Sequence, residues 1–263
     1  MKLCMAAAAA CLAWSGLAAA QAPAQDLPRA ASDVRSKSAQ WPSPQGESWD
    51  AIKQLPDWSG VWQGSISSFK PPPPPQLTPA YAARMAAYNA AKARGENLQT
   101  AHANCMPFAF PSSMGIYPVE FLFTPGKVTV AIETDSQMRR IFTDGRKLPE
   151  DPDLAFQGYS VGHWEGDTLV DDTTGLVPAP QMEIMDGLGH SDRLRIHERI
   201  HLVGPDSLEV SWTYDDPEVL AQPWTVTRVY QRHRDWDLEE YNCSQNNHDA
   251  ADDKGRPSMR LDQ

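Results

Sequence analysis

The sequence predicts a mainly β protein: an antiparallel, lipocalin-like barrel of about nine or ten strands with one Ala-rich helix. From residue 119 onward, apolar side chains return at every second position, which is the period of a half-buried strand. Short turn sequences such as Pro125-Gly126 and Glu165-Gly166-Asp167 separate these segments. A meander of this length must expose an edge strand or close on itself, and closure into a barrel removes the edge.

The first segment of the chain has the composition of a secretory signal peptide. Lys2 precedes an apolar stretch that ends in Ala18-Ala19-Ala20, a small-residue cleavage site. We therefore expect a periplasmic or secreted protein. Removal of the leader leaves Cys105 and Cys243, and an even pair of cysteines in an oxidising compartment predicts one disulfide.

Composition divides the rest of the chain into further segments. We expect a signal peptide at 1–20, a flexible N-terminal segment at 21–55, a β-barrel domain at 56–247 with a helix at 79–94 inserted, and a flexible tail at 248–263. Pro71 to Pro75 is an extended polyproline II run, either a spacer or the ligand of a proline-recognising partner. Thr78 can cap the helix, with Pro79 at its first position.

The charge balance excludes some partners. The 263 residues include 23 Lys+Arg and 34 Asp+Glu, a net charge of -11, whereas nucleic-acid binders need clustered cations. No apolar run after the first twenty positions reaches the roughly 20 residues of a membrane-spanning helix. We therefore expect neither a nucleic-acid partner nor a transmembrane segment after signal cleavage.

His197-Glu198-Arg199-Ile200-His201 matches the H-E-x-x-H motif of zinc hydrolases. That chemistry needs a helix, because on a strand two residues four apart are separated by about 13 Å. The apolar residues Leu194, Ile196, Ile200 and Leu202 alternate with polar ones, which favours a strand. A zinc-dependent hydrolase that uses His197, Glu198 and His201 remains an alternative.

The same alternation turns Glu198 toward the interior. Arg228 shares parity with Trp224 and Tyr230, so it should point inward as well. A buried charge needs a partner, and each of the two could be the other's. The pair is either a structural salt bridge or the polar centre of a ligand pocket.

Two further kinds of residue belong to the predicted pocket. Trp212, Tyr230 and Trp224 would line it beside Arg228. His190 begins the strand that carries Glu198, where it is either a general acid or base at the barrel mouth or a capping residue.

Gly60-Val61-Trp62 is similar to the Gly-x-Trp signature of lipocalin-type barrels. The segments 56–62, 120–126, 140–146, 164–170 and 223–226 resemble a family of secreted bacterial proteins that carry the motif W-E-G-D-T-L-V. The resemblance covers about residues 56 to 247 and implies a lipocalin-like barrel without implying a reaction. The chain departs from the family at Asp171, where Val is usual, and at His197 and His201.

Together these observations predict a barrel that binds a hydrophobic, aromatic small molecule. If it is an enzyme, we expect cofactor-free proton transfer by a lyase, isomerase or hydrolase, with Glu198 and His190 as acid and base and Arg228 orienting an oxygen. The alternatives are a non-catalytic ligand-binding protein, the zinc hydrolase, and an envelope scaffold that uses the proline run.

Overall fold

The computed structural model describes residues 48–64, 72–96, 106–115, 117–178, 189–242, 250–251 and 257–258. All of them belong to one compact unit, Pro42–Gln263. The predicted signal peptide, most of the segment 21–55, both Cys105 and Cys243, and most of the tail 248–263 lie outside the described residues.

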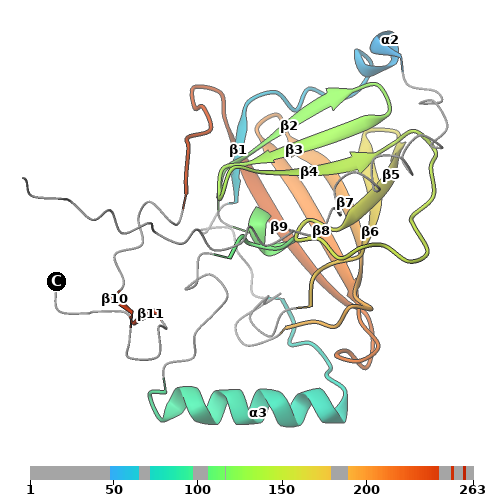
Figure 1. Ribbon diagram of the computed structural model, residues 1–263. Coiled ribbons are helices and arrows are strands. Elements are labelled where there is room, and N and C mark those ends of the chain that lie inside the picture. The colour runs from blue at the N-terminus through green and yellow to red at the C-terminus, as the bar shows by residue number, and fades with distance from the viewer. Residues whose placement is uncertain are drawn as a thin grey trace, which may run out of the picture. The chain divides into compact units, whose positions relative to one another are not determined.

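Nine strands close into one barrel in the order β1 to β9 (Figure 1), which confirms the predicted mainly β fold. The strands are β1 Val61–Gly64, β2 Val119–Thr124, β3 Lys127–Ile132, β4 Gln137–Phe142, β5 Tyr159–Glu165, β6 Thr168–Thr174, β7 Arg195–Gly204, β8 Ser207–Asp215 and β9 Trp224–His233. Two further short strands, β10 Ala250–Ala251 and β11 Pro257–Ser258, form a separate antiparallel pair in the predicted tail.

The expectation of a wholly antiparallel barrel is wrong at one seam. β4 and β5 run parallel, with Ile141 opposite Ser160 and Phe142 opposite Val161. The reason is the connection: residues 143–158 form a long crossing segment here in place of a hairpin. Nine strands that alternated throughout would leave β1 parallel to β9, so the one parallel seam lets β9 close antiparallel on β1.

The predicted helix is α3, Pro79–Ala93, with Pro79 in its first turn. The Thr78 hydroxyl accepts a hydrogen bond from the Tyr81 backbone N–H, as expected of a helix cap. Tyr81 and Met85 pack against the core of the barrel. No helix in the described part of the chain is both long enough and apolar enough to span a membrane.

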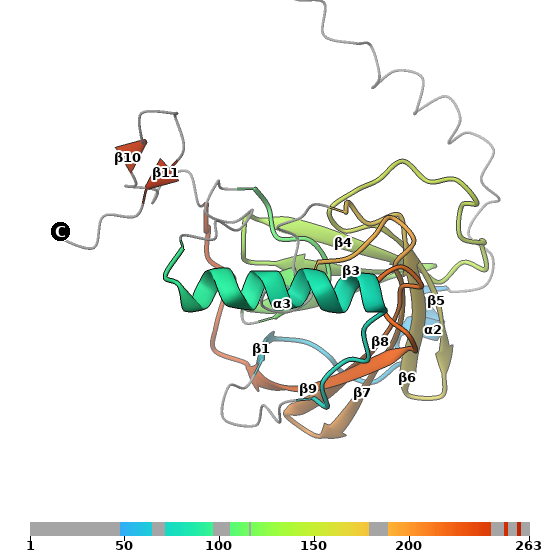
Figure 2. The ribbon, with the colours of Figure 1, turned by 90° about the horizontal axis from the view of Figure 1, so that it is seen from below.

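The barrel end beside the short helix α2 (Trp49–Ile52) is closed by aromatic packing. Trp58 contacts Phe121, Phe123 and Trp164 with ring centroids 5.2 to 5.4 Å apart. The Arg232 guanidinium lies over the Trp62 ring at 4.4 Å. Figure 2 shows α3 across the other end of the barrel.

Residues 106–115, which include the 3-10 turn η3 (Ser112–Met114), reach into the barrel interior, and we call them the plug. Phe110 and Met114 are fully buried. Gln157, from the crossing segment, makes two hydrogen bonds to the plug. Its side chain donates to the Phe108 carbonyl at 3.1 Å and accepts from the Ser113 hydroxyl at 3.2 Å. The plug therefore fills the space that an open barrel would offer a ligand.

Candidate functional site

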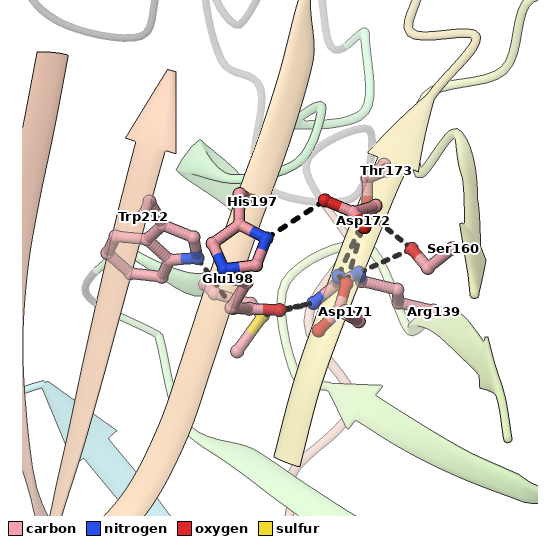
Figure 3. A network of polar contacts seen from close by, with 9 residues as sticks. Arg139, Ser160, Asp171, Asp172, Thr173, His197, Glu198 and Trp212 are labelled. Carbon is pink, nitrogen blue, oxygen red and sulfur yellow. Dashed lines mark hydrogen bonds and ion pairs between the residues drawn. The ribbon is translucent and has the colours of Figure 1, made fainter. Parts of the chain in front are cut away.

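A cluster of three buried charged residues lies inside the barrel (Figure 3). The guanidinium of Arg139 lies between Asp171 and Glu198, and each ion-pair distance is 2.6 Å. All three side chains are fully buried. An ion cluster without water around it is costly unless its members hold one another, and this one is held on both sides.

Strand register brings these residues together. Asp171 on β6 lies directly opposite Glu198 on β7, so both carboxyl groups face the interior side by side. Arg139 on β4 alternates with the exposed Met138 and Arg140 and therefore also points inward.

Two hydroxyl groups complete the shell around Arg139. The Ser160 hydroxyl accepts from its Nε at 3.2 Å, and the Thr173 hydroxyl accepts from one of its terminal nitrogens at 3.1 Å. Ser160 and Thr173 lie opposite each other on β5 and β6. The guanidinium is thus bound by four side chains from three strands.

The prediction that Glu198 points inward is confirmed, but its predicted partner is wrong. One carboxylate oxygen accepts from Arg139, and the other accepts from the Trp212 indole N–H at 2.6 Å. Arg228 does point inward, yet it donates to the Gly115 carbonyl of the plug at 2.7 Å. Parity along a strand gives the direction of a side chain and not the partner it meets.

Burial of the cluster favours the protonated form of one carboxyl group, that of Asp171. Burial raises the pKa of Asp171 well above its usual 3.8, and the neighbouring Glu198 raises it further, although Arg139 opposes both. Burial acts to lower the pKa of Arg139, but Asp171 and Glu198 together outweigh it, so the guanidinium stays charged. The fold thus favours the protonated form of Asp171, whose Oδ2 has no hydrogen-bond partner among the described residues.

The plug covers the open face of Arg139. The Phe110 ring lies over the guanidinium at 3.7 Å, and the Met114 sulfur is 3.8 Å from a terminal nitrogen. A cation under an aromatic face gains electrostatic attraction that strengthens when water is absent.

The other residues predicted to bind substrate all point inward but contact the protein's own chain. Trp212 binds Glu198, and Tyr230 donates its hydroxyl hydrogen to the Met114 carbonyl. The Trp224 indole N–H donates to the Pro73 carbonyl at 2.7 Å. Tyr230 thus binds a backbone carbonyl of the plug, and Trp224 binds one of the proline run.

His190 is buried at 7% exposure, but no hydrogen bond joins it to Glu198 within the described residues. Its Nδ1 lies 2.8 Å from the Ser191 carbonyl oxygen, and its Nε2 has no partner in the described part. Burial lowers the pKa of the imidazole, which favours its neutral form. His190 therefore does not lie beside Glu198 as its acid–base partner. The carboxyl group directly opposite Glu198 is that of Asp171.

His197 and His201 lie on a strand and on the outer face of the barrel, so the helical geometry of a zinc-hydrolase motif is not formed. His197 contacts Asp172 at 2.9 Å, and His201 lies 4.0 Å from Glu209. Residues four apart on a strand are separated by about 13 Å, too far to share one ion. The zinc-hydrolase alternative requires a helix at these residues, and the structure has a strand there.

Sequence reasoning missed Arg139, Asp171, Ser160 and Thr173 as parts of the site. The signal was available for the two charges, because Arg139 is in phase with the buried Ile141 and Asp171 with the buried Leu169. Ser160 belongs to a Gly-x-Ser-x-Gly match, but it lies within a strand and not on a strand-to-helix turn.

No family model matches the chain, and no curated protein matches it. The resemblance to secreted bacterial proteins therefore remains a prediction.

Proposed function

We propose that the protein binds a hydrophobic, aromatic small molecule with a carbonyl or carboxylate oxygen at the place that the plug occupies. The main support is a pair of donors in the barrel wall. Tyr230 donates to the Met114 carbonyl, and Arg228 donates to the Gly115 carbonyl at 2.7 Å. A ligand oxygen can satisfy the same donors, and ligand sites commonly combine a few convergent polar groups with apolar walls.

The apolar contacts of the plug support the same class of ligand. The Phe110 ring rests on the Arg139 guanidinium at 3.7 Å, a contact that the ring of an aromatic ligand can reproduce. Binding is then an exchange in which the ligand replaces the ring and carbonyls of the plug. Because aromatic residues close the barrel end beside α2, we expect the ligand to enter from the other end.

We place this activity in the periplasm or outside the cell, following the predicted signal peptide. The acidic charge of the chain does not favour an anionic polymer as ligand, and it is compatible with a small-molecule ligand.

Two probes test the proposal on the wild-type protein. Acetophenone has an aromatic ring and a carbonyl oxygen, and ethylbenzene has nearly the same shape without the oxygen. Each is titrated into isotope-labelled protein while backbone amide signals are followed by NMR. We expect acetophenone to bind about tenfold more tightly, the equivalent of one hydrogen bond of roughly 1.4 kcal/mol, and to shift the signals of the plug.

Tyr230→Phe removes one donor and should abolish most of the preference for acetophenone. Ser211→Ala, on the outer face of β8, is the control and should leave the preference intact. Equal affinity of the wild type for both probes, or shifts confined to regions away from the plug, would refute the proposed site.

Acid–base chemistry on the bound molecule is a second candidate function, favoured by the raised pKa of Asp171 directly opposite Glu198. With a ketone beside Arg139, Glu198 would accept a proton from the carbon next to the carbonyl. Asp171 would give its proton to the carbonyl oxygen, and the product is the enol. This step needs no cofactor and is shared by lyases and isomerases.

Exchange of the acetophenone methyl hydrogens in D₂O measures that step directly. Glu198→Gln should slow the exchange about 100-fold or more while leaving binding in place. Glu209→Gln, on the outer face of β8, serves as the matched control. Exchange at the same rate in E198Q and wild type would leave the protein a non-catalytic binder.

A further inference from the structure

The proline run packs on the protein through one of its faces. Pro72 and Pro75 are half-buried, whereas Pro73 and Pro74 between them are exposed. Consecutive prolines are restricted to polyproline II, which has three residues per turn, so residues three apart lie on one face. We call residues 72–76 the strap.

One member of a stacked aromatic pair on the barrel holds the strap. Tyr214 on β8 and Trp224 on β9 lie directly opposite each other, and their rings stack with centroids 5.3 Å apart. The Trp224 indole N–H donates to the Pro73 carbonyl at 2.7 Å. Polyproline II makes no hydrogen bonds of its own, so its carbonyls are free to accept such a donor.

We propose that Trp224 and Tyr214 form a polyproline-recognition site, which the strap occupies and which binds a proline-rich peptide in trans when the strap is displaced. An aromatic surface with an N–H donor toward a proline carbonyl is the combination by which proline-recognising domains bind their ligands. The polyproline helix is preformed, so little conformational entropy is lost on docking. The inference does not depend on the proposed small-molecule ligand.

The strap is held at high effective concentration. The last residue of the strap and the residue after it are anchored, because the Ala221 N–H donates to the Gln76 carbonyl at 2.8 Å and Leu77 pairs with Leu220. A short tether gives an effective concentration of about millimolar, so a peptide in trans competes poorly with an intact strap. A test must therefore weaken the strap without removing it.

Two matched double variants do this. Pro72→Ala with Pro75→Ala alters the face that packs on the barrel, and Pro73→Ala with Pro74→Ala alters the exposed face by the same number of prolines. The readout is the indole N–H signal of Trp224 by NMR, assigned with Trp224→Phe. We expect the first variant to shift this signal toward that of a solvated indole, and the second to leave it near its wild-type position.

A peptide with the sequence Pro-Pro-Pro-Pro-Pro-Gln-Leu, that of residues 71–77, is then added to the first variant. We expect saturable binding that returns the Trp224 signal toward its wild-type position. The same peptide should bind about tenfold more weakly when Trp224→Phe is added, because one hydrogen bond is lost. A peptide with alanine in place of every proline should not bind.

The proposal is overturned if both double variants leave the Trp224 signal unmoved, or if the folded P72A/P75A protein binds no proline peptide. If that variant does not fold, the wild type is titrated with the proline peptide at millimolar concentration, where it competes with the strap. A shift of the Trp224 signal there supports the site, and no shift rejects it.

Discussion

Asp171 and Glu198 lie directly opposite each other on β6 and β7, and both bind the same guanidinium, that of Arg139. Two carboxyl groups and one cation that are all fully buried cannot all be ionised without a large electrostatic cost. Burial and the neighbouring Glu198 accordingly raise the pKa of Asp171. The three residues act as one unit, and substitutions within it should not be additive.

The raised pKa of Asp171 makes stability depend on pH. Its pKa in the folded protein is raised above the usual 3.8, so the folded state binds this proton more tightly than the unfolded state. The contribution is full below about pH 4 and is lost as the pH rises toward the folded value. Asp171→Asn mimics the protonated form and removes this dependence.

We therefore expect the free energy of unfolding of D171N to rise relative to that of the wild type as the pH increases from about 4. Urea denaturation at a series of pH values measures it. Asp172→Asn is the matched control, since Asp172 is the adjacent residue on the outer face. Parallel pH profiles for D171N and wild type would contradict the raised pKa of Asp171.

Arg139→Met should strongly lower the free energy of unfolding. It leaves two buried carboxyl groups without their cation, and breaking a buried ion pair costs about 3 to 5 kcal/mol. The loss should shrink at low pH, where both carboxyl groups can be neutral. Arg140→Met changes the next, exposed residue of β4 and should alter stability by less than about 0.5 kcal/mol. Similar unfolding free energies for the two variants would show that the cluster is not a stabilising unit.

The barrel was predictable because its main signal is local. The period-two pattern of β7 and β8 gave both the strands and the inward direction of Glu198 and Trp212, as the structure confirms. Turn residues and the cap of α3 are local signals too.

The pairing within the site was not predictable in the same way. Arg139 and Glu198 are 59 residues apart, and they meet because β4, β5, β6 and β7 are neighbours in the closed barrel. The parallel β4–β5 seam and the plug depend on long segments with no periodic pattern. Such contacts are set by closure of the whole sheet, which a single stretch of sequence does not specify.

The close approach of β5 and β6 at Gly162 gives a further prediction. A Cβ added there would lie 2.6 Å from the Val170 carbonyl oxygen and 2.8 Å from the Asp171 Cβ, so the strands must separate. We expect Gly162→Ala to destabilise the protein by about 1 to 3 kcal/mol and to displace Asp171. Gly204→Ala is the control, because the nearest atom to its added Cβ is 3.7 Å away. Thermal unfolding of both variants checks the prediction, and equal melting temperatures would contradict it.

The predicted disulfide between Cys105 and Cys243 gains support from the aromatic residues near both cysteines. The Tyr117 ring contacts Phe108 at 5.7 Å and Tyr241 at 5.4 Å between centroids. Cys105 precedes Phe108 by three positions and Cys243 follows Tyr241 by two, so described residues close in sequence to each cysteine contact the same ring.

Protein folded under oxidising conditions without residues 1–20 should therefore show no free thiol, and reduction should add the mass of two hydrogen atoms. Cys105→Ser should lower the free energy of unfolding by about 2 to 5 kcal/mol under oxidising conditions, because the bond restricts the unfolded chain. Under reducing conditions the variant and the wild type should differ little, which separates the bond from simple packing of the thiol. Two titratable thiols per oxidised, folded chain would rule the bond out, and with it the main chemical argument for an extracytoplasmic location.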